Sequence, residues 1–363
     1  MKILFVLEYY YPHIGGVETL FKNLCEGLVK KGHKVKVVTM QIQGTKEREY
    51  VGGVEITRTP PENRYLFTFL SFFDVLRLAK GVDIIVTTTY NGAPPAWLAS
   101  RLLNKPCVMI VNEIMGDRWG LMVEGEASAF FHKWAERLII NLKFDKYVGI
   151  SKSTVKQIQK LGQDAEVIYL GVDYEHFDPS KYTSIKENNG FTYLYFGRPG
   201  TTKGVGDLII ACDIVSELLK DSKLILILSK DPPKERKRLL DMIDKWKLQD
   251  KIIVKDSVPY NELPRYILGA NCVVIPSLSE GFGLSCAEAC AMGVPVVANN
   301  LDSLPEVISG KYRLSRADYY CHYIPLAADI IRVAFGMYTE TPLKKFEWSE
   351  CVDKYEALFK NLV

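Results

Sequence analysis

The sequence predicts an α/β protein built from two doubly wound, Rossmann-like parallel sheets. Short apolar runs alternate with stretches of helical composition along the whole chain, which is typical of strand–helix–strand units and a parallel sheet. The chain has 363 residues, more than a single core usually organises, so we expect two domains of ordinary size.

The apolar runs place five strands in each half of the chain. In the first half they are residues 3–7, 35–40, 84–88, 107–111 and 147–150. In the second half they are residues 192–196, 224–228, 252–254, 272–275 and 294–298. Ligands of open parallel sheets bind beyond the carboxyl ends of the strands. We therefore expect two sheets that face each other across a ligand cleft.

Composition excludes several classes of protein. A hydrophobic fraction of 48% and a charged fraction of 25% are those of a soluble globular protein, and a net charge of +3 is too small to indicate nucleic-acid binding. No apolar run approaches the length of a membrane span. The eight cysteines form no C-x-x-C pair, so we expect reduced, buried thiols in a cytoplasmic protein.

The segment 277–289 (Ser-Leu-Ser-Glu-Gly-Phe-Gly-Leu-Ser-Cys-Ala-Glu-Ala) holds the strongest functional signal. It joins the predicted strand 272–275 to residues 284–292, whose composition is helical. Glu280 therefore lies on the loop and Glu288 inside the helix. Small residues surround Glu288, which suits a closely packed helix better than an exposed one.

The glycines of this segment predict an anion site. Gly281 and Gly283 leave backbone N–H groups uncovered at the positive end of the helix, a place suited to a diphosphate. Carboxylates beside such a site accept hydrogen bonds from hydroxyl groups. A diphosphate together with a polyol describes a nucleotide sugar.

A basic pair follows the first strand of the second half. Arg198 can hold phosphate oxygens through two hydrogen bonds, and Lys203 supplies a movable point charge. Taken without the other motifs, the pair would be read as two solvated loop residues.

Two glycines follow the first strand of the chain. Gly15 and Gly16 leave a bare backbone that a ligand could approach closely, although an ordinary turn is the alternative. The fingerprint G-x-G-x-x-G is absent after this strand, which argues against a nicotinamide-dependent enzyme.

These segments together resemble retaining glycosyltransferases of family 4, which have the two-domain GT-B architecture. Segment 277–289 resembles the E-x7-E motif of that family, and residues 11–18 (Tyr-Pro-His-Ile-Gly-Gly-Val-Glu) resemble its glycine-rich first loop. Phe196-Gly197-Arg198 with Lys203-Gly204 resembles its donor-phosphate segment. The order and spacing of the segments carry the resemblance over most of the chain.

The resemblance implies a role for each motif. Glu288 would hold the ribose hydroxyls, Glu280 would contact the sugar, and Arg198 and Lys203 would stabilise the departing diphosphate. Further donor-binding residues that it implies are Gly15, Gly16, Gly197, Gly281, Phe282, Gly283 and Leu284. The implied reaction moves a hexosyl group from a nucleoside diphosphate sugar to an acceptor hydroxyl with retention of configuration.

The acceptor side departs from the family. Asn112 and Glu113 stand where many members have His followed by an acid, and an amide can bind a hydroxyl but cannot take a proton. We place His13, Asn112 and Glu113 on the acceptor or sugar side, and leave the donor base and sugar open. We expect a glycan or a lipid-linked molecule as acceptor and leave its identity and linkage open.

The resemblance also implies the domain limits. Residues 1–170 would form the acceptor-side domain and residues 171–345 the nucleotide-sugar domain. Residues 346–363 would form a helix that crosses back to the first domain.

No metal or other cofactor is expected. The sequence lacks a D-x-D motif, and its five histidines show no ligand spacing. Paired acids also occur in glycoside hydrolases, but the two cations and the absence of a barrel pattern argue against that class. A sugar-nucleotide epimerase and a non-catalytic donor-binding subunit remain open alternatives.

Two aromatic segments permit two interpretations. Residues 65–73 are aromatic at many positions, and Phe130, Phe131, Trp134 and Leu138 form a helical stripe near basic residues. An apolar helical face normally packs against its own protein, so we favour core helices. The alternative is a peripheral contact with the inner face of a membrane, where a lipid-linked acceptor would lie.

Overall fold

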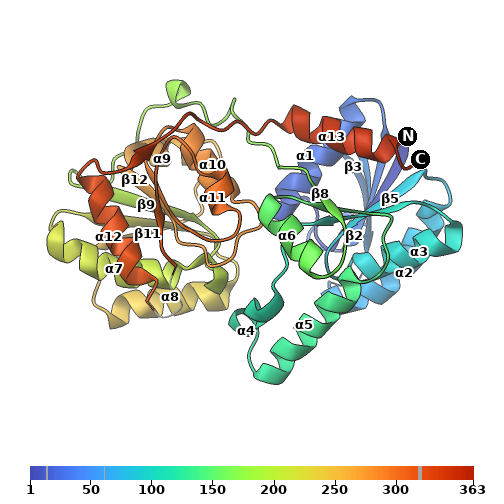
Figure 1. Cartoon of the computed structure of the whole chain (residues 1–363), viewed down its shortest axis with the longest axis horizontal. Coiled ribbons are helices and arrows are strands. Elements are labelled where there is room, and N and C mark those ends of the chain that lie inside the picture. Colours follow the sequence, from blue (N-terminus) through green and yellow to red (C-terminus); the bar gives the residue numbers. More distant parts are fainter. Residues whose placement is uncertain (14, 61, 318–320) are drawn as a thin grey trace. The chain divides into compact units, whose positions relative to one another are not determined.

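The computed structural model describes residues 1–13, 15–60, 62–317 and 321–363, which form two compact units (Figure 1). Unit 1 comprises Met1–Gly171 together with Phe346–Val363, and unit 2 comprises Val172–Lys345. In the described part of the chain, no helix is long and apolar enough to cross a membrane.

Unit 1 contains an eight-stranded sheet with the order β3-β4-β2-β1-β5-β6-β7-β8. Its strands are β1 (Lys2–Val6), β2 (Lys34–Met40), β3 (Arg48–Val51), β4 (Val54–Thr59), β5 (Ile84–Thr88), β6 (Cys107–Val111), β7 (Lys146–Gly149) and β8 (Ala165–Val167). All neighbours pair in parallel except β3 and β4. The expectation of a purely parallel sheet is therefore wrong at this edge. Gly52 and Gly53 both have positive φ and form a two-residue loop, which joins antiparallel strands.

Helices cover both faces of this sheet. The helices of unit 1 are α1 (Gly16–Lys30), α2 (Arg64–Ala79), α3 (Ala93–Leu103), the 3-10 turn η1 (Gly116–Arg118), α4 (Trp119–Met122), α5 (Glu126–Ile140), α6 (Lys152–Lys160) and α13 (Trp348–Lys360). The Phe5 ring of β1 packs against Phe21 of α1 at 6.0 Å and Phe359 of α13 at 6.5 Å. Leu4 and Val6 point to the other face, where they share a core with α2, α3 and the end of α5.

The C-terminal helix α13 is held on α1 by polar contacts as well as by Phe359. The Glu356 carboxylate accepts hydrogen bonds from Lys31 and from His33, both at 2.9 Å. A Cβ added to Gly171 would overlap Trp348, so only glycine allows the chain to pass this close to the start of α13.

Unit 2 contains a seven-stranded sheet with the order β11-β10-β9-β12-β13-β14-β15. Its strands are β9 (Thr192–Gly197), β10 (Lys223–Leu228), β11 (Ile252–Asp256), β12 (Cys272–Ile275), β13 (Val296–Asn299), β14 (Lys311–Ser315) and β15 (Thr339–Glu340). Only β15 runs antiparallel to its neighbour, so this sheet is also mixed at one edge. β14 and β15 were not predicted because neither is a continuous apolar run.

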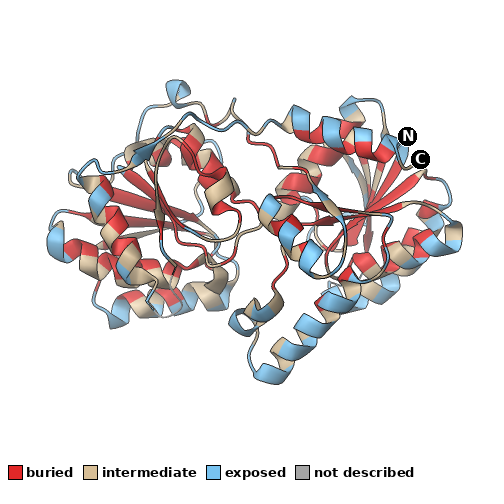
Figure 2. Ribbon diagram, viewed as in Figure 1, coloured by how far each residue is buried: buried red, intermediate tan, exposed pale blue. Residues whose placement is uncertain are grey.

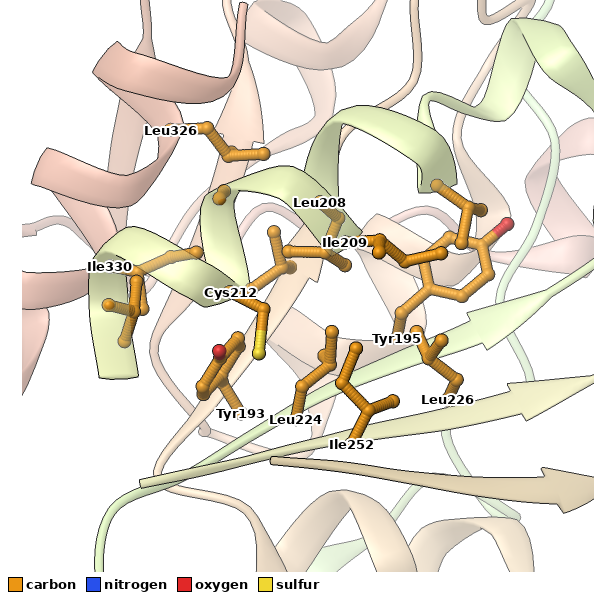
Figure 3. Close-up of a cluster of buried hydrophobic side chains, with 14 of the residues drawn as sticks. Tyr193, Tyr195, Leu208, Ile209, Cys212, Leu224, Leu226, Ile252, Leu326 and Ile330 are labelled. Carbon is orange, nitrogen blue, oxygen red and sulfur yellow. The ribbon is translucent and has the colours of Figure 1, made fainter. Parts of the chain in front are cut away.

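The core of unit 2 lies between its sheet and helices α7 and α12. The helices are η2 (Pro179–Lys181), η3 (Thr201–Lys203), α7 (Val205–Leu218), α8 (Pro233–Lys245), α9 (Leu263–Gly269), α10 (Leu284–Ala291), α11 (Leu304–Val307) and α12 (Tyr323–Ala334). Figure 3 shows Leu208 and Cys212 of α7 above Tyr193 and Leu224 of the strands. Burial of these apolar side chains holds α7 against β9 and β10 and so positions the loop that precedes this helix.

The thiols are mostly as expected. All eight cysteines are free and seven are buried, whereas Cys321 is exposed. The prediction of a buried thiol is wrong at Cys321, because this residue precedes α12 instead of lying within a helix or strand.

The two aromatic segments belong to the core only in part. In α2 the inward face is made by Phe67, Ser71, Val75 and Ala79, so the rings of Tyr65, Phe69 and Phe73 point outward. In α5 only Glu136 and Ile140 are buried, and Figure 2 shows most of this helix as exposed. The favoured core interpretation is therefore wrong for these outward side chains. α2 has one face in the core and α5 reaches the core at its C-terminal end, while the aromatic side chains on their other faces are exposed among the residues that the structure describes.

Candidate active site

The predicted donor residues of unit 2 gather where the strand order of the sheet reverses. β9 lies between β10 and β12, so the loops after β9 and β12 leave the sheet side by side. The backbone N–H of Leu278 donates to the carbonyl of Thr202 at 2.7 Å. Lys203 Nζ donates to Glu280 Oε2 at 2.9 Å, although the two residues are 77 positions apart. The sheet therefore brings Lys203 and Glu280 together.

The loop after β9 has a fixed path. Tyr195, which is buried, donates its hydroxyl hydrogen to the carbonyl of Arg198 at 2.8 Å. Gly204 ends η3 with φ +67°, and a Cβ there would overlap the carbonyl oxygen of Pro276. Only glycine satisfies both the backbone angle and the close approach. Gly204 thus allows the Lys203 loop to pack closely against the loop that carries Glu280.

Arg198 points to a different partner. Its Nη2 lies 3.3 Å from Oδ2 of Asp231, and both side chains are largely exposed. Such a surface pair contributes little free energy in water, so a phosphate group can replace Asp231 at small cost. Asp231 was not predicted from the sequence, because it follows a different strand, β10.

Hydrogen bonds to Ser303 and Asp302 fix the loop between β12 and α10. Ser303, which is fully buried, donates to the carbonyl oxygens of Glu280 and Phe282, bifurcated at 2.8 Å each. Asp302 Oδ2 accepts from the backbone N–H of Glu280 at 3.2 Å. Gly283 then starts α10 with φ +98°, and no side chain among the described residues caps that end. The first turn of α10, beginning at Leu284, keeps the polarity that binds an anion.

Glu288 lies farther along α10 in a half-buried position. Burial raises the pKa of its carboxyl group to about 7, with a further contribution from the negative charge of Asp173. Burial also raises the pKa of Tyr260, followed by the charges of Glu288 and Asp173. His176 stacks on Tyr260 with a centroid distance of 3.9 Å. Asp173 and Tyr260 therefore lie near Glu288, and His176 packs on Tyr260; none of the three was predicted as a site residue.

Unit 1 has its own switch point, between β1 and β5. Glu8 follows β1 and is buried, and Asn91 Nδ2 donates to its Oε2 at 2.6 Å. Arg64 Nε lies 3.0 Å from Glu8 Oε1. The sequence showed Glu8 only as the end of an apolar run, although a carboxylate directly after the first strand was a usable signal.

The first loop of unit 1 is partly described, since Ile14 lies outside the described residues. His13 Nδ1 lies 2.9 Å from Glu18 Oε1, and its ring stacks on Tyr9 at 4.5 Å. Gly15 precedes α1 with φ −179°, an extended conformation that any residue adopts, and Gly16 is the first residue of α1. The backbone angle therefore gives no reason for glycine at position 15.

The loop after β6 holds the other acceptor-side candidates. Asn112 is buried, and its Nδ2 donates to Thr88 Oγ1 at 2.6 Å, whereas its Oδ1 has no hydrogen-bond partner within the described ranges. Glu113 is half-buried beside it. Glu136 of α5 accepts the backbone N–H groups of residues 115 and 116 at 2.8 Å each. This buried carboxylate fixes the loop that follows Asn112 and Glu113, at the carboxyl end of β6 and two strands away from the His13 loop.

Comparison with known families identifies the chain. Residues 14–176 match Glycosyltransferase Family 4, and residues 179–313 match Glycosyl transferases group 1. The chain is a family 4 glycosyltransferase. Its enzyme class and its dependence on nucleotide-sugar donors follow from that membership, and the fold class predicted from the sequence is confirmed.

Relatives of this glycosyltransferase span most of its length. It is 27% identical over 330 residues to an uncharacterized glycosyltransferase of Methanocaldococcus jannaschii, a match that covers 85% of this chain and 83% of the other. It is 24% identical over 344 residues to the alpha-monoglucosyldiacylglycerol synthase of Streptococcus pneumoniae, covering 86% and 74%.

A solved structure shares the fold of this glycosyltransferase. The Anabaena protein HepE, crystallised in complex with UDP-glucose, superposes with a TM-score of 0.72 at 17% identity and covers 100% of both chains. At that identity the likeness shows the GT-B architecture alone.

Metal ligands do not gather in this glycosyltransferase within residues 1–13, 15–60, 62–317 and 321–363, where no three His, Cys, Asp or Glu side chains are placed to hold an ion.

Proposed function

We propose that this glycosyltransferase transfers a hexosyl group from a nucleoside diphosphate sugar to an acceptor hydroxyl and retains the anomeric configuration. The observation that carries the proposal is the Lys203–Glu280 pair at 2.9 Å, held at the switch point of unit 2 beside the start of α10. A cation, a carboxylate and an anion-binding helix end meet there, which is what a diphosphate joined to a sugar requires.

Positive charge stabilises the leaving group. One further negative charge develops on the diphosphate as it departs, and Arg198, Lys203 and the first turn of α10 would face it. Arg198 would exchange its exposed contact with Asp231 for a phosphate oxygen. These groups take the place that a divalent ion has in other transferases, so we propose that activity is independent of metal.

The two acids of the E-x7-E segment have separate tasks. Glu280 is fixed by its backbone contacts to Ser303 and Asp302, so its carboxylate can orient Lys203 and a sugar hydroxyl at once. Glu288 would accept hydrogen bonds from the ribose hydroxyls in its ionised form. Gly281, Phe282 and Gly283 of this loop would contact the sugar and the diphosphate of the bound donor.

The chemical step is a substitution on one face of the sugar. The bond between the anomeric carbon and the phosphate oxygen breaks, and its electron pair leaves with the diphosphate. The acceptor oxygen bonds to the anomeric carbon on the same face, and its proton passes to the departing phosphate oxygen. The protein orients the reactants and stabilises charge, and no enzyme nucleophile is required.

Unit 1 would bind the acceptor. His13, Asn112 and Glu113 follow strands β1 and β6 at the edge where ligands of such sheets bind, and Glu8 lies at the same edge. The unpartnered Oδ1 of Asn112 can accept a hydrogen bond from an acceptor hydroxyl. The name of the Streptococcus relative denotes a glycolipid product, which supports a lipid-linked acceptor for this chain.

The test is a donor panel. The protein is incubated with UDP-, GDP- and ADP-sugars, beginning with UDP-glucose because the HepE structure contains it. We expect slow release of nucleoside diphosphate from one donor without acceptor, and faster release with lipid or glycan acceptors. An isomerised sugar would identify an epimerase, and donor binding without release under all conditions would identify a donor-binding subunit.

A further inference from the structure

Helices α2 and α5 expose aromatic side chains in one region of unit 1. We call this region the aromatic surface and define it by Tyr65, Phe69, Phe73, Phe130, Phe131 and Trp134, which are 51 to 73% exposed. Residues Phe67, Val75 and Ala79 of α2 share a core with Ile140 at the end of α5, and Tyr65 Oη lies 3.4 Å from His132 Nε2 of α5. The aromatic surface is therefore continuous from one helix to the other, and contiguous exposed apolar area of this kind marks a site of interaction.

A chain of ring contacts joins this surface to the proposed acceptor edge. Tyr90, which follows β5, contacts the Trp119 ring at 5.7 Å, and Trp119 contacts His132 at 4.9 Å. His132 in turn contacts Phe131 at 6.0 Å. The Tyr90 hydroxyl also donates to Glu136 at 2.9 Å, the carboxylate that fixes the loop after Asn112. The aromatic surface is thus connected through these rings to side chains at the proposed acceptor edge.

Basic residues lie at one end of the same helices. The crossover helices of a parallel sheet run in one direction, so their C-terminal ends lie along the same edge. The last turns of α2, α3 and α5 and the residues just beyond them carry Arg77, Lys80, Arg101, Lys105, Arg137 and Lys143. Acidic residues near this end are Asp74, Asp83 and Asp145, and Glu124 and Glu126 lie at the opposite end of α5.

We propose that the aromatic surface docks on an anionic lipid bilayer and that the acceptor hydroxyl belongs to a membrane lipid, an acceptor class that rests on the function proposed above. Aromatic rings enter the region between headgroups and acyl chains, while the basic helix ends stay among anionic headgroups. Trp134 suits this place because its ring is apolar and its N–H reaches a polar group. The bilayer presents its lipids at the acceptor edge of unit 1.

The test is sedimentation of the full chain with vesicles. Vesicles of phosphatidylcholine with about one third phosphatidylglycerol are compared with pure phosphatidylcholine, at about 0.1 M and about 0.5 M sodium chloride. We expect the wild type to sediment with the anionic vesicles and to detach at the higher salt. The double variant Phe69→Ser/Trp134→Ser should lose at least about tenfold in the bound fraction.

Phe335→Ser is the matched control, because Phe335 of unit 2 is 70% exposed and Phe69 is 73% exposed. It should sediment like the wild type, and the double variant should keep the wild-type melting temperature. Arg137→Glu should weaken binding to the anionic vesicles and leave binding to pure phosphatidylcholine vesicles unchanged.

Four results would overturn the docking proposal. The first two are a wild type that stays in solution and equal sedimentation of the wild type and the double variant. The other two are a large fall in the melting temperature of the double variant, and a dimeric wild type whose double variant is monomeric. Release of nucleotide from the donor without vesicles is measured on the same samples. Failure of the proposed function would appear there, whereas failure of docking would leave that release intact.

Discussion

Glu288→Gln tests the assignment of the ribose-binding acid. Because the pKa of Glu288 is raised to about 7, roughly one tenth of this side chain is ionised at pH 6 and roughly nine tenths at pH 8. In the proposed role the ionised carboxylate accepts hydrogen bonds from both ribose hydroxyls, whereas in the protonated acid one oxygen carries a hydrogen. For the nucleotide sugar that the donor panel identifies, the dissociation constant of the wild type should therefore fall about tenfold between pH 6 and pH 8.

The variant should lose this dependence on pH. At pH 8 it lacks a charged acceptor worth about 1.5 to 3 kcal/mol, so its dissociation constant should be roughly ten- to 150-fold higher than that of the wild type. Calorimetry with that nucleotide sugar is the assay, because the diphosphate of a nucleotide sugar has no titrating proton between pH 6 and pH 8. Asp173→Asn is the matched variant: it removes the charge that helps to raise the pKa of Glu288, so tight binding should begin at a lower pH.

Two results would refute the reasoning: equal affinity of wild type and Glu288→Gln at pH 8, or a wild-type affinity that does not change with pH. The free protein provides an independent check. Its folded state holds the Glu288 proton more tightly than the unfolded chain, whose pKa is about 4.5. This residue should therefore lower the free energy of unfolding as pH rises from about 4.5 to about 7, and Glu288→Gln should remove that contribution.

Three further predictions concern the loops around the diphosphate. Arg198→Ala and Lys203→Ala should each lower kcat about a hundredfold or more, with the exposed Lys220→Ala as control; a folded Arg198→Ala enzyme of wild-type activity would contradict the clamp. Turnover should persist in excess EDTA, and loss that magnesium or manganese restores would disprove the metal-independent step. Gly204→Ala should abolish donor binding in calorimetry, because its added Cβ overlaps the neighbouring loop as well as straining a φ of +67°. Gly162→Ala, at φ +84° in open space, should cost only about 1 to 2 kcal/mol of stability and leave donor binding unchanged, and equal effects of the two would exclude the steric argument.

The sequence by itself determined the α/β class and the positions of the loops. Strands buried on both faces are continuous apolar runs, so β1, β5, β6, β9 and β12 are visible without tertiary information. Glycines and acids between a strand and a helix likewise marked the donor segments, because the backbone needs of a turn are local. The strands β3, β4, β8, β14 and β15 escaped notice because none of them is a continuous apolar run.

Only the tertiary structure decided which side chains meet and which surfaces stay in water. Strand order places the β9 loop beside the β12 loop, and so joins Lys203 to Glu280 across 77 residues. The same kind of long-range contact places Asn91 on Glu8 and Asp173 near Glu288. Helical periodicity predicted apolar faces on α2 and α5, but a pattern along one helix does not specify whether another layer covers that face. That depends on how the whole sheet is assembled.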